Sequence, residues 1–251
     1  MEALQQIRNF RKRNMFCFSP PVMLATFAIE ICLAGYMMWR YTLNRVSRLV
    51  VTMFGFLAIF QLAEYMVCGG MGMSANTWAR IGYVSITMLP PLGVHLAYAL
   101  AGKKNRAVVT GTYVAAAGFM SYFLLASDVF TGSQCLGNYV IFQLGTSAAH
   151  LYTIYYYGLL LFTIGLSFQF ANSAEDKAKR ALHAFIAGYV LFMLPTTVVN
   201  TVSPSTIAGI PSIMCGFAVL LALVVSFWVM PLVGEQRERE ATHSGERHRP
   251  A

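Results

Sequence analysis

The chain has 251 residues, of which 57% are hydrophobic and 11% are charged, and its formal net charge is +8. A soluble domain usually carries charge on about a quarter of its positions, so this composition excludes a water-soluble fold. The Lys and Arg residues lie in short clusters between apolar stretches and form no single basic face. This distribution favours membrane headgroups over nucleic acid as the partner.

Seven apolar runs are long enough to cross about 30 Å of hydrocarbon, which needs roughly 20 residues. The sequence therefore predicts an all-α membrane bundle of seven helices over residues 20–232. It is preceded by a basic polar segment, 1–19, and followed by a charged cytoplasmic tail, 233–251, which we expect to be disordered. The predicted helices are 20–39, 49–68, 80–101, 107–126, 148–170, 182–200 and 207–232.

Proline and glycine residues mark the expected breaks in these helices. The pair Pro90-Pro91 predicts a kink in the third helix, and Gly69-Gly70 ends the second. Pro195, Pro204 and Pro211 interrupt the sixth and seventh runs.

The distribution of cations predicts the orientation. The connections after the first, third and fifth helices are rich in Lys and Arg, as is the tail, so this side should be cytoplasmic. The segment 1–19 conflicts, because Arg8, Arg11, Lys12 and Arg13 would lie outside. Either this segment is translocated against its charge, or translation begins at Met15. We predict the N-terminus outside and the C-terminus inside a prokaryotic cytoplasmic membrane.

Ionisable side chains in hydrocarbon cost at least about 2.5 kcal/mol each, so each one is a functional candidate. Glu30 lies near the middle of the first helix, and Gln61 and Glu64 share a face of the second. Each carboxyl could line a pocket or an ion pathway. Alternatively, its role could be limited to a hydrogen bond with a neighbouring helix. His95 follows the kink, where a structural donor is a more ordinary role than a metal ligand, and Asn200 is a further intramembrane polar residue.

A ligand pocket is expected near the outer surface. Its candidate residues are Gln61, Glu64, Arg80, Tyr152 and Tyr156. The tyrosines from 152 to 157 follow His150 at the start of the fifth helix. They could instead serve as an interfacial belt and in helix packing.

The five cysteines are spread singly, without a CxxC pair or zinc-type spacing. Cys17, Cys68 and Cys135 fall on the predicted outer side, where an oxidising compartment permits a disulfide. Cys135 lies in the longest outer connection, 127–147, and could pair with Cys17 or Cys68. All three could equally remain free thiols.

The residues that several known reaction types require are absent from the sequence. The sixth and seventh helices contain no Lys for a retinal Schiff base, and HExxH, GxSxG and P-loop motifs are absent. We therefore expect no cofactor, no metal and no enzyme activity.

The stretch 55–106 contains FLAIFQLAEYMVC and TWARIGYVSITMLPPLGVHLAYALAGKKNR. It resembles the N-terminal seven-helix sensor region of some bacterial histidine kinases and cyclic-nucleotide signalling proteins. Trp78 and Arg80 match the Trp and Arg that open the third helix there, and Pro90 and Pro91 match its proline segment. The resemblance implies a sensor bundle, here followed by a tail too short for a kinase domain.

The opening Met15-Phe16-Cys17-Phe18-Ser19-Pro20 is similar to that of small uncharacterised prokaryotic membrane proteins that begin Met-Cys-Phe-Ser. Phe16 and the 14 residues before Met15 depart from that pattern.

The sequence is compatible with three functions. The leading hypothesis is a receptor-like protein that binds a small or lipid-soluble ligand from outside and signals to a separate cytoplasmic partner. The second is a small transporter or proton-coupled carrier that uses Glu30 and Glu64. The third is an intramembrane metalloenzyme built on Cys17, Glu64, His95 or His150.

Overall fold

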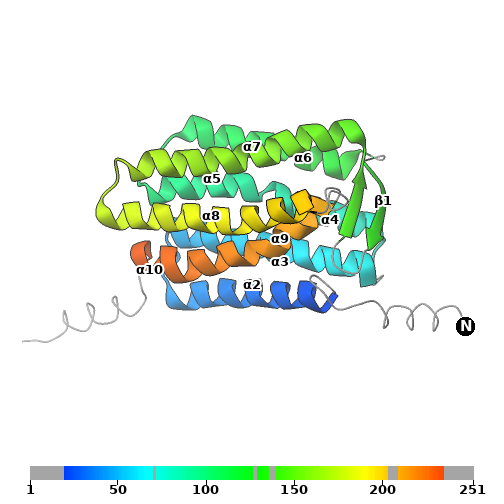
Figure 1. The fold of residues 1–251 in the computed structure, drawn as a ribbon, viewed down its shortest axis with the longest axis horizontal. Helices are drawn as coiled ribbons and strands as arrows, with labels where there is room; N and C mark the ends of the chain where they lie inside the picture. Colours follow the sequence, from blue (N-terminus) through cyan, green and yellow to red (C-terminus); the bar gives the residue numbers. More distant parts are fainter. Residues whose placement is uncertain (1–19, 70–71, 127–128, 136–139, 203–208, 235–251) are drawn as a thin grey trace, which may run out of the picture.

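The computed structural model describes residues 20–69, 72–126, 129–135, 140–202 and 209–234, and the predicted terminal segments 1–19 and most of 233–251 lie outside this part of the chain. Among the described residues, seven helical spans are long and apolar enough to cross a bilayer, which confirms the predicted all-α multi-pass membrane bundle. The helices run roughly alongside one another, with a small sheet at one end (Figure 1).

The first two spans are single helices that pack against each other, α2 (Pro20–Arg40) and α3 (Arg45–Gly69). The third span consists of α4 (Ala75–Thr87) and α5 (Leu89–Leu100), and α6 (Arg106–Leu125) follows. Because α3 also packs against α4, α5 and α9, it occupies the centre of the bundle.

The fifth and sixth spans are long helices, α7 (Thr146–Ala171) and α8 (Asp176–Val202). The seventh combines α9 (Ile210–Val224), a π-helical segment η2 (Val225–Val229) and α10 (Met230–Val233). The sixth helix starts six residues before the predicted Leu182, because its polar first turn extends beyond the apolar run. Pro195 lies inside α8 without ending it.

The sequence predicted a kink at Pro90-Pro91, and the third span is interrupted just before this pair, at Met88 between α4 and α5. Proline has no N–H, so Pro91 cannot donate to the Thr87 carbonyl one turn earlier. The Tyr155 hydroxyl of α7 donates to this carbonyl instead, at 2.8 Å. A side chain from another helix thus replaces the missing backbone donor.

The connection 127–147 contains a β-hairpin that the sequence did not predict. Strands β1 (Phe130–Cys135) and β2 (Val140–Leu144) pair antiparallel, with Cys135 opposite Val140. Val140 and Phe142 are buried and alternate with half-buried Ile141 and Gln143, so one face of β2 packs on the helices. We call this end of the bundle the hairpin end, and the opposite one, with the α2–α3, α5–α6 and α7–α8 connections, the basic end (Figure 1).

Large apolar side chains cover the outside of the bundle. Leu125 is 84% exposed, Ile154 71% and Trp228 61%. Soluble monomers rarely expose contiguous apolar surface of this kind, whereas lipid tails accept it. The outer surface therefore suits contact with hydrocarbon.

Candidate functional site

Aromatic side chains fasten the hairpin to the helices. The Tyr83 ring lies at the centre of this cluster, with ring centroids of Phe123, Phe130, Phe142 and Tyr152 at 5.1–5.6 Å. Most of these pairs meet edge to face, the favoured arrangement for aromatic rings. Both strands are therefore held on α4, α6 and α7.

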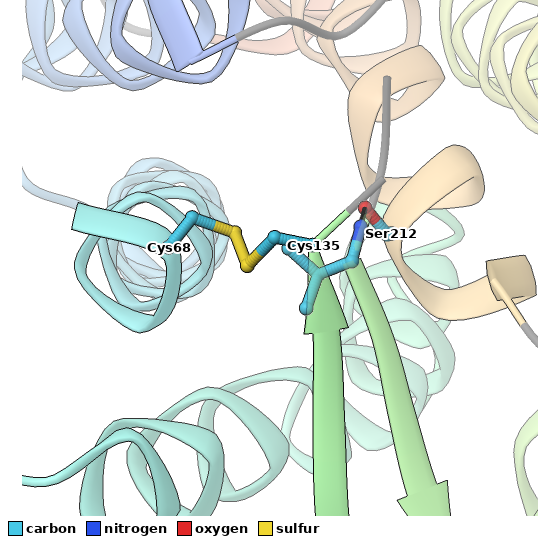
Figure 2. Close-up of a disulfide and its surroundings, with 4 residues drawn as sticks. Cys68, Cys135 and Ser212 are labelled. Atoms are coloured by element: carbon cyan, nitrogen blue, oxygen red, sulfur yellow. Dashed lines mark hydrogen bonds between the residues drawn. A yellow bond between two sulfur atoms is a disulfide. The ribbon is translucent and has the colours of Figure 1, made fainter. Parts of the chain in front are cut away.

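Two further links hold the hairpin. Cys68 at the end of α3 forms a disulfide with Cys135 at the end of β1, one of the pairings left open by the sequence (Figure 2). On the other strand, the Val140 N–H donates to the Ser212 hydroxyl of α9 at 3.1 Å (Figure 2). Cys17, the other pairing candidate, lies outside the described residues.

A cavity of 510 Å³ opens between β2, α4, α7 and α9. Its apolar and aromatic walls include Tyr83, Phe142, Tyr152, Tyr156, Pro211 and Met214. Gln143, His150 and Thr153 add polar groups. This volume and this mixture of many apolar and few polar groups are typical of small-molecule sites.

Of the residues predicted to bind a ligand, Tyr152 and Tyr156 line this cavity. The Tyr152 hydroxyl lies 3.1 Å from that of Thr87, so it also braces the break between α4 and α5. The remaining walls come from segments far apart in the sequence, Tyr83 to Met214, and no spacing along the chain reveals that they meet. The one local signal for β2 was the run of β-branched and aromatic residues in VIFQL.

Gln61 and Glu64 lie behind the cavity rather than on its wall. Both are 1% exposed on α3, and the Glu64 carboxyl interacts with the Ser212 hydroxyl, next to the cavity residue Pro211. Glu30 on α2 is fully buried and close enough to Glu64 for electrostatic interaction. Both oxygens of Glu30, one oxygen of Glu64 and the Gln61 amide nitrogen have no hydrogen-bond partner.

Arg80 was predicted to line the ligand pocket, but it contacts the end of α6. Its guanidinium donates to the carbonyl oxygens of Leu124 at 3.0 Å and Ala126 at 2.7 Å, at the end of α6. The last carbonyls of a helix lack intrahelical donors and carry partial negative charge. Arg80 therefore caps α6, and it is not among the residues that line the cavity.

The other two predicted polar residues lie apart from the cavity. His95 on α5 is near the basic end, where the Arg45 guanidinium donates to its Nε2 at 2.9 Å. A guanidinium can only donate, so Nε2 must be the acceptor nitrogen of the ring and Nδ1 carries the proton. Nδ1 lies 3.2 Å from the Tyr113 hydroxyl and donates to it. Asn200 is half-buried in the last turns of α8.

Of the residues predicted for a metalloenzyme, Glu64, His95 and His150 do not form a cluster, and Cys17 lies outside the described residues. Within the described ranges, no three His, Cys, Asp or Glu side chains gather as ligands of a metal ion would. Glu64 is buried and is not among the residues that line the cavity, and His95 lies at the other end of the bundle from His150.

Comparison with protein-family models found no match for this chain, and neither did comparison with curated proteins.

Proposed function

We propose that this membrane protein is receptor-like and binds a small apolar or lipid-soluble ligand in the cavity at the hairpin end. The observation that carries the proposal is the cavity itself, which has 510 Å³ and mostly aromatic and apolar walls. Ligand sites of this size bury most of a small molecule and use a few polar groups to orient it. Gln143, His150 and Thr153 are among the polar residues that line this cavity.

The hairpin supports this assignment, because its strand β2 forms one wall of the cavity and each of its two strands is anchored to a helix. The disulfide ties β1 to α3, and Ser212 ties β2 to α9. A wall held in this way preorganises the site, which lowers the free-energy cost of binding.

We place the hairpin end outside a prokaryotic cytoplasmic membrane. A disulfide persists in an oxidising compartment and is rare in the cytosol, and Cys68–Cys135 lies at this end. Lys and Arg gather at the other end, in the connections after α2, α5 and α7, as cytoplasmic loops require. A signal would pass from these loops to a separate partner, as the resemblance to sensor regions of histidine kinases implies.

A thermal-shift screen of lipid-soluble aromatic and aliphatic compounds tests the binding. The full chain in nanodiscs is compared with Ala149→Trp, which fills the cavity, and with Ala115→Trp, which adds the same side chain to an exposed position of α6. We expect compounds that raise the melting temperature of the parent and Ala115→Trp but leave Ala149→Trp unchanged. A library without effect on any of them, or with equal effects on all three, contradicts the proposal.

A proton-coupled carrier is the second candidate function. It is favoured by Glu30 and Glu64, two interacting carboxyls in the bundle core with three oxygens that lack a partner. Intramembrane acids of this kind form proton relays in pumps and transporters. If the protein is a carrier, proteoliposomes that contain it should take up protons, and Glu30→Gln should abolish this flux. Glu175→Gln, at an exposed position of the basic end, should leave the flux intact. Flux that is unchanged in Glu30→Gln removes this candidate.

A further inference from the structure

The basic end contains a second cavity, far from the first. It has 340 Å³ and is lined by residues from the start of α3, from α5, from the α5–α6 connection and from the start of α6. The polar lining residues are Arg45, His95, Lys104, Asn105, Arg106 and Thr110. Three of these carry a permanent positive charge, and none of the residues that line this cavity is acidic.

The positive charge of this cavity is not neutralised within the described part of the chain. No carboxylate there forms an ion pair with Arg45, Lys104 or Arg106. Lys103 differs, since its ammonium donates to the Ser173 hydroxyl at 3.0 Å and lies 4.6 Å from the centre of the Phe170 ring. Among the described residues, Arg45, Lys104 and Arg106 thus have no anionic partner, whereas the contacts of Lys103 direct its charge away from the cavity.

The first turn of α6 adds to the positive potential. Asn105 caps this helix of 20 residues, with its side chain accepting from the Val108 N–H at 3.2 Å. The earlier amides, those of Arg106 and Ala107, have no acceptor within an α-helix, and the helix dipole places partial positive charge there. Three cationic side chains and a helix start thus converge on one hollow.

His95 holds Arg45 in place. Its Nε2 accepts from Arg45, and its Nδ1 faces the Tyr113 hydroxyl of α6. This chain of contacts connects α3, α5 and α6 through side chains. The contact with His95 uses one of the five guanidinium N–H donors of Arg45. The remaining donors can bind two oxygens of a phosphate at once.

We propose that this cavity is a binding site for a phosphate group, either the headgroup of an anionic phospholipid or a free phosphorylated solute. Arg45, Lys104 and Arg106 would bind the phosphate oxygens, and His95 would orient Arg45. The position suits a lipid headgroup, since the residues lie at the ends of membrane-spanning helices. The inference is independent of the ligand proposed for the hairpin end.

Native mass spectrometry of the full chain provides the test. The protein is reconstituted with phosphatidylglycerol or with phosphatidylcholine, and the retained lipid is counted after mild delipidation. Inorganic phosphate and pyrophosphate are added to the delipidated protein in a separate arm. Arg45→Gln and Arg106→Gln remove cations of the cavity, while Arg48→Gln and Lys177→Gln remove one charge each from exposed positions of the same end. Arg106 is itself exposed, so its replacement keeps the test valid if Arg45→Gln fails to fold.

We expect Arg45→Gln and Arg106→Gln to weaken retention about tenfold, as the loss of a hydrogen bond to a charged group implies. Arg48→Gln and Lys177→Gln should stay close to the parent. Retention of phosphatidylglycerol alone identifies a lipid site, and binding of pyrophosphate or phosphate identifies a soluble ligand. Equal losses in all four variants, or no binding in either arm, overturn the proposal.

Discussion

Several polar side chains in this bundle bond backbone groups that water would satisfy in a soluble protein. Tyr155 donates to the Thr87 carbonyl that Pro91 leaves without a donor. Arg80 donates to the last carbonyls of α6. In hydrocarbon each unpaired backbone group costs several kcal/mol, so these side chains make the helix break and the helix end possible.

The sequence identified these residues but not their partners. Arg80 stands out because it is a cation near an apolar run, yet its acceptors lie more than 40 residues later in the chain. The same holds for Glu30, Gln61 and Glu64, which were predicted as rare intramembrane polar groups and are indeed buried. Which of them faces a cavity depends on packing between helices, which no local pattern encodes.

Replacement of Arg80 by Gln should destabilise the fold. The change leaves the carbonyls of Leu124 and Ala126 without their charged donor, and hydrogen bonds to charged groups contribute about 1.5–3 kcal/mol each. We expect a lower melting temperature in nanodiscs, with ligand binding retained by the folded fraction. Arg48→Gln, an exposed charge loss, is the control. A stable Arg80→Gln protein that no longer binds ligand would assign Arg80 to the ligand site instead.

Two elements determine the shape of the hairpin end, the hairpin itself and the broken third span. Pro90-Pro91 predicted the break, because proline has no N–H to donate to the carbonyl one turn earlier in a helix. The hairpin was not predicted, since its strands of six and five residues are short and carry no helical period. Their stability depends on the rings of Tyr83 and Phe123 and on Cys68, which belong to other parts of the chain.

Removal of the disulfide should loosen the hairpin. In the double variant Cys68→Ser and Cys135→Ser the ends of β1 and α3 are no longer joined. Loss of a native disulfide typically costs about 2–5 kcal/mol, so the melting temperature should fall and cavity ligands should be held less tightly. Cys32→Ser, which changes an exposed free thiol, should behave like the parent. A double variant with parental stability and binding would show that the aromatic contacts alone hold the hairpin.

A further prediction concerns the packing of α5 on α8. A methyl group on Gly93 would overlap the Tyr189 hydroxyl, whereas one on Gly111 or Gly118 of α6 would meet nothing within 4 Å. Overpacking of a filled core costs about 1–3 kcal/mol. Gly93→Ala should therefore lower the melting temperature, Gly118→Ala should not, and adding Tyr189→Phe to Gly93→Ala should recover part of the loss. Equal melting temperatures for Gly93→Ala and Gly118→Ala would refute the close contact.

For the bundle as a unit, the sequence predicted the number, order and approximate bounds of the seven spans. It succeeded because each span must provide about 20 apolar residues of its own, a property of the local sequence. The cavity has no such local property. Its walls come from α4, β2, α7 and α9, and they meet because of the three-dimensional packing of the bundle.

The seven-span arrangement predicts that the hairpin and the α5–α6 connection lie on opposite sides of the membrane. Single cysteines at Thr131 and Lys104, both exposed, can be introduced after Cys17 and Cys32 are changed to Ser. A membrane-impermeant maleimide added to intact cells should label the Thr131→Cys protein, and the Lys104→Cys protein only after the membrane is opened. Labelling of both in intact cells would contradict the arrangement.

Photo-crosslinking in the native membrane tests the ligand cavity most directly. The photoreactive residue p-benzoylphenylalanine is placed at Tyr157, which lines the cavity, or at Phe162, which is 42% exposed on the same helix. Mass spectrometry then identifies what each position captures. A binding cavity predicts a discrete small-molecule adduct at position 157 and membrane phospholipids at position 162. The same phospholipid adducts at both positions, or none at position 157, would contradict it.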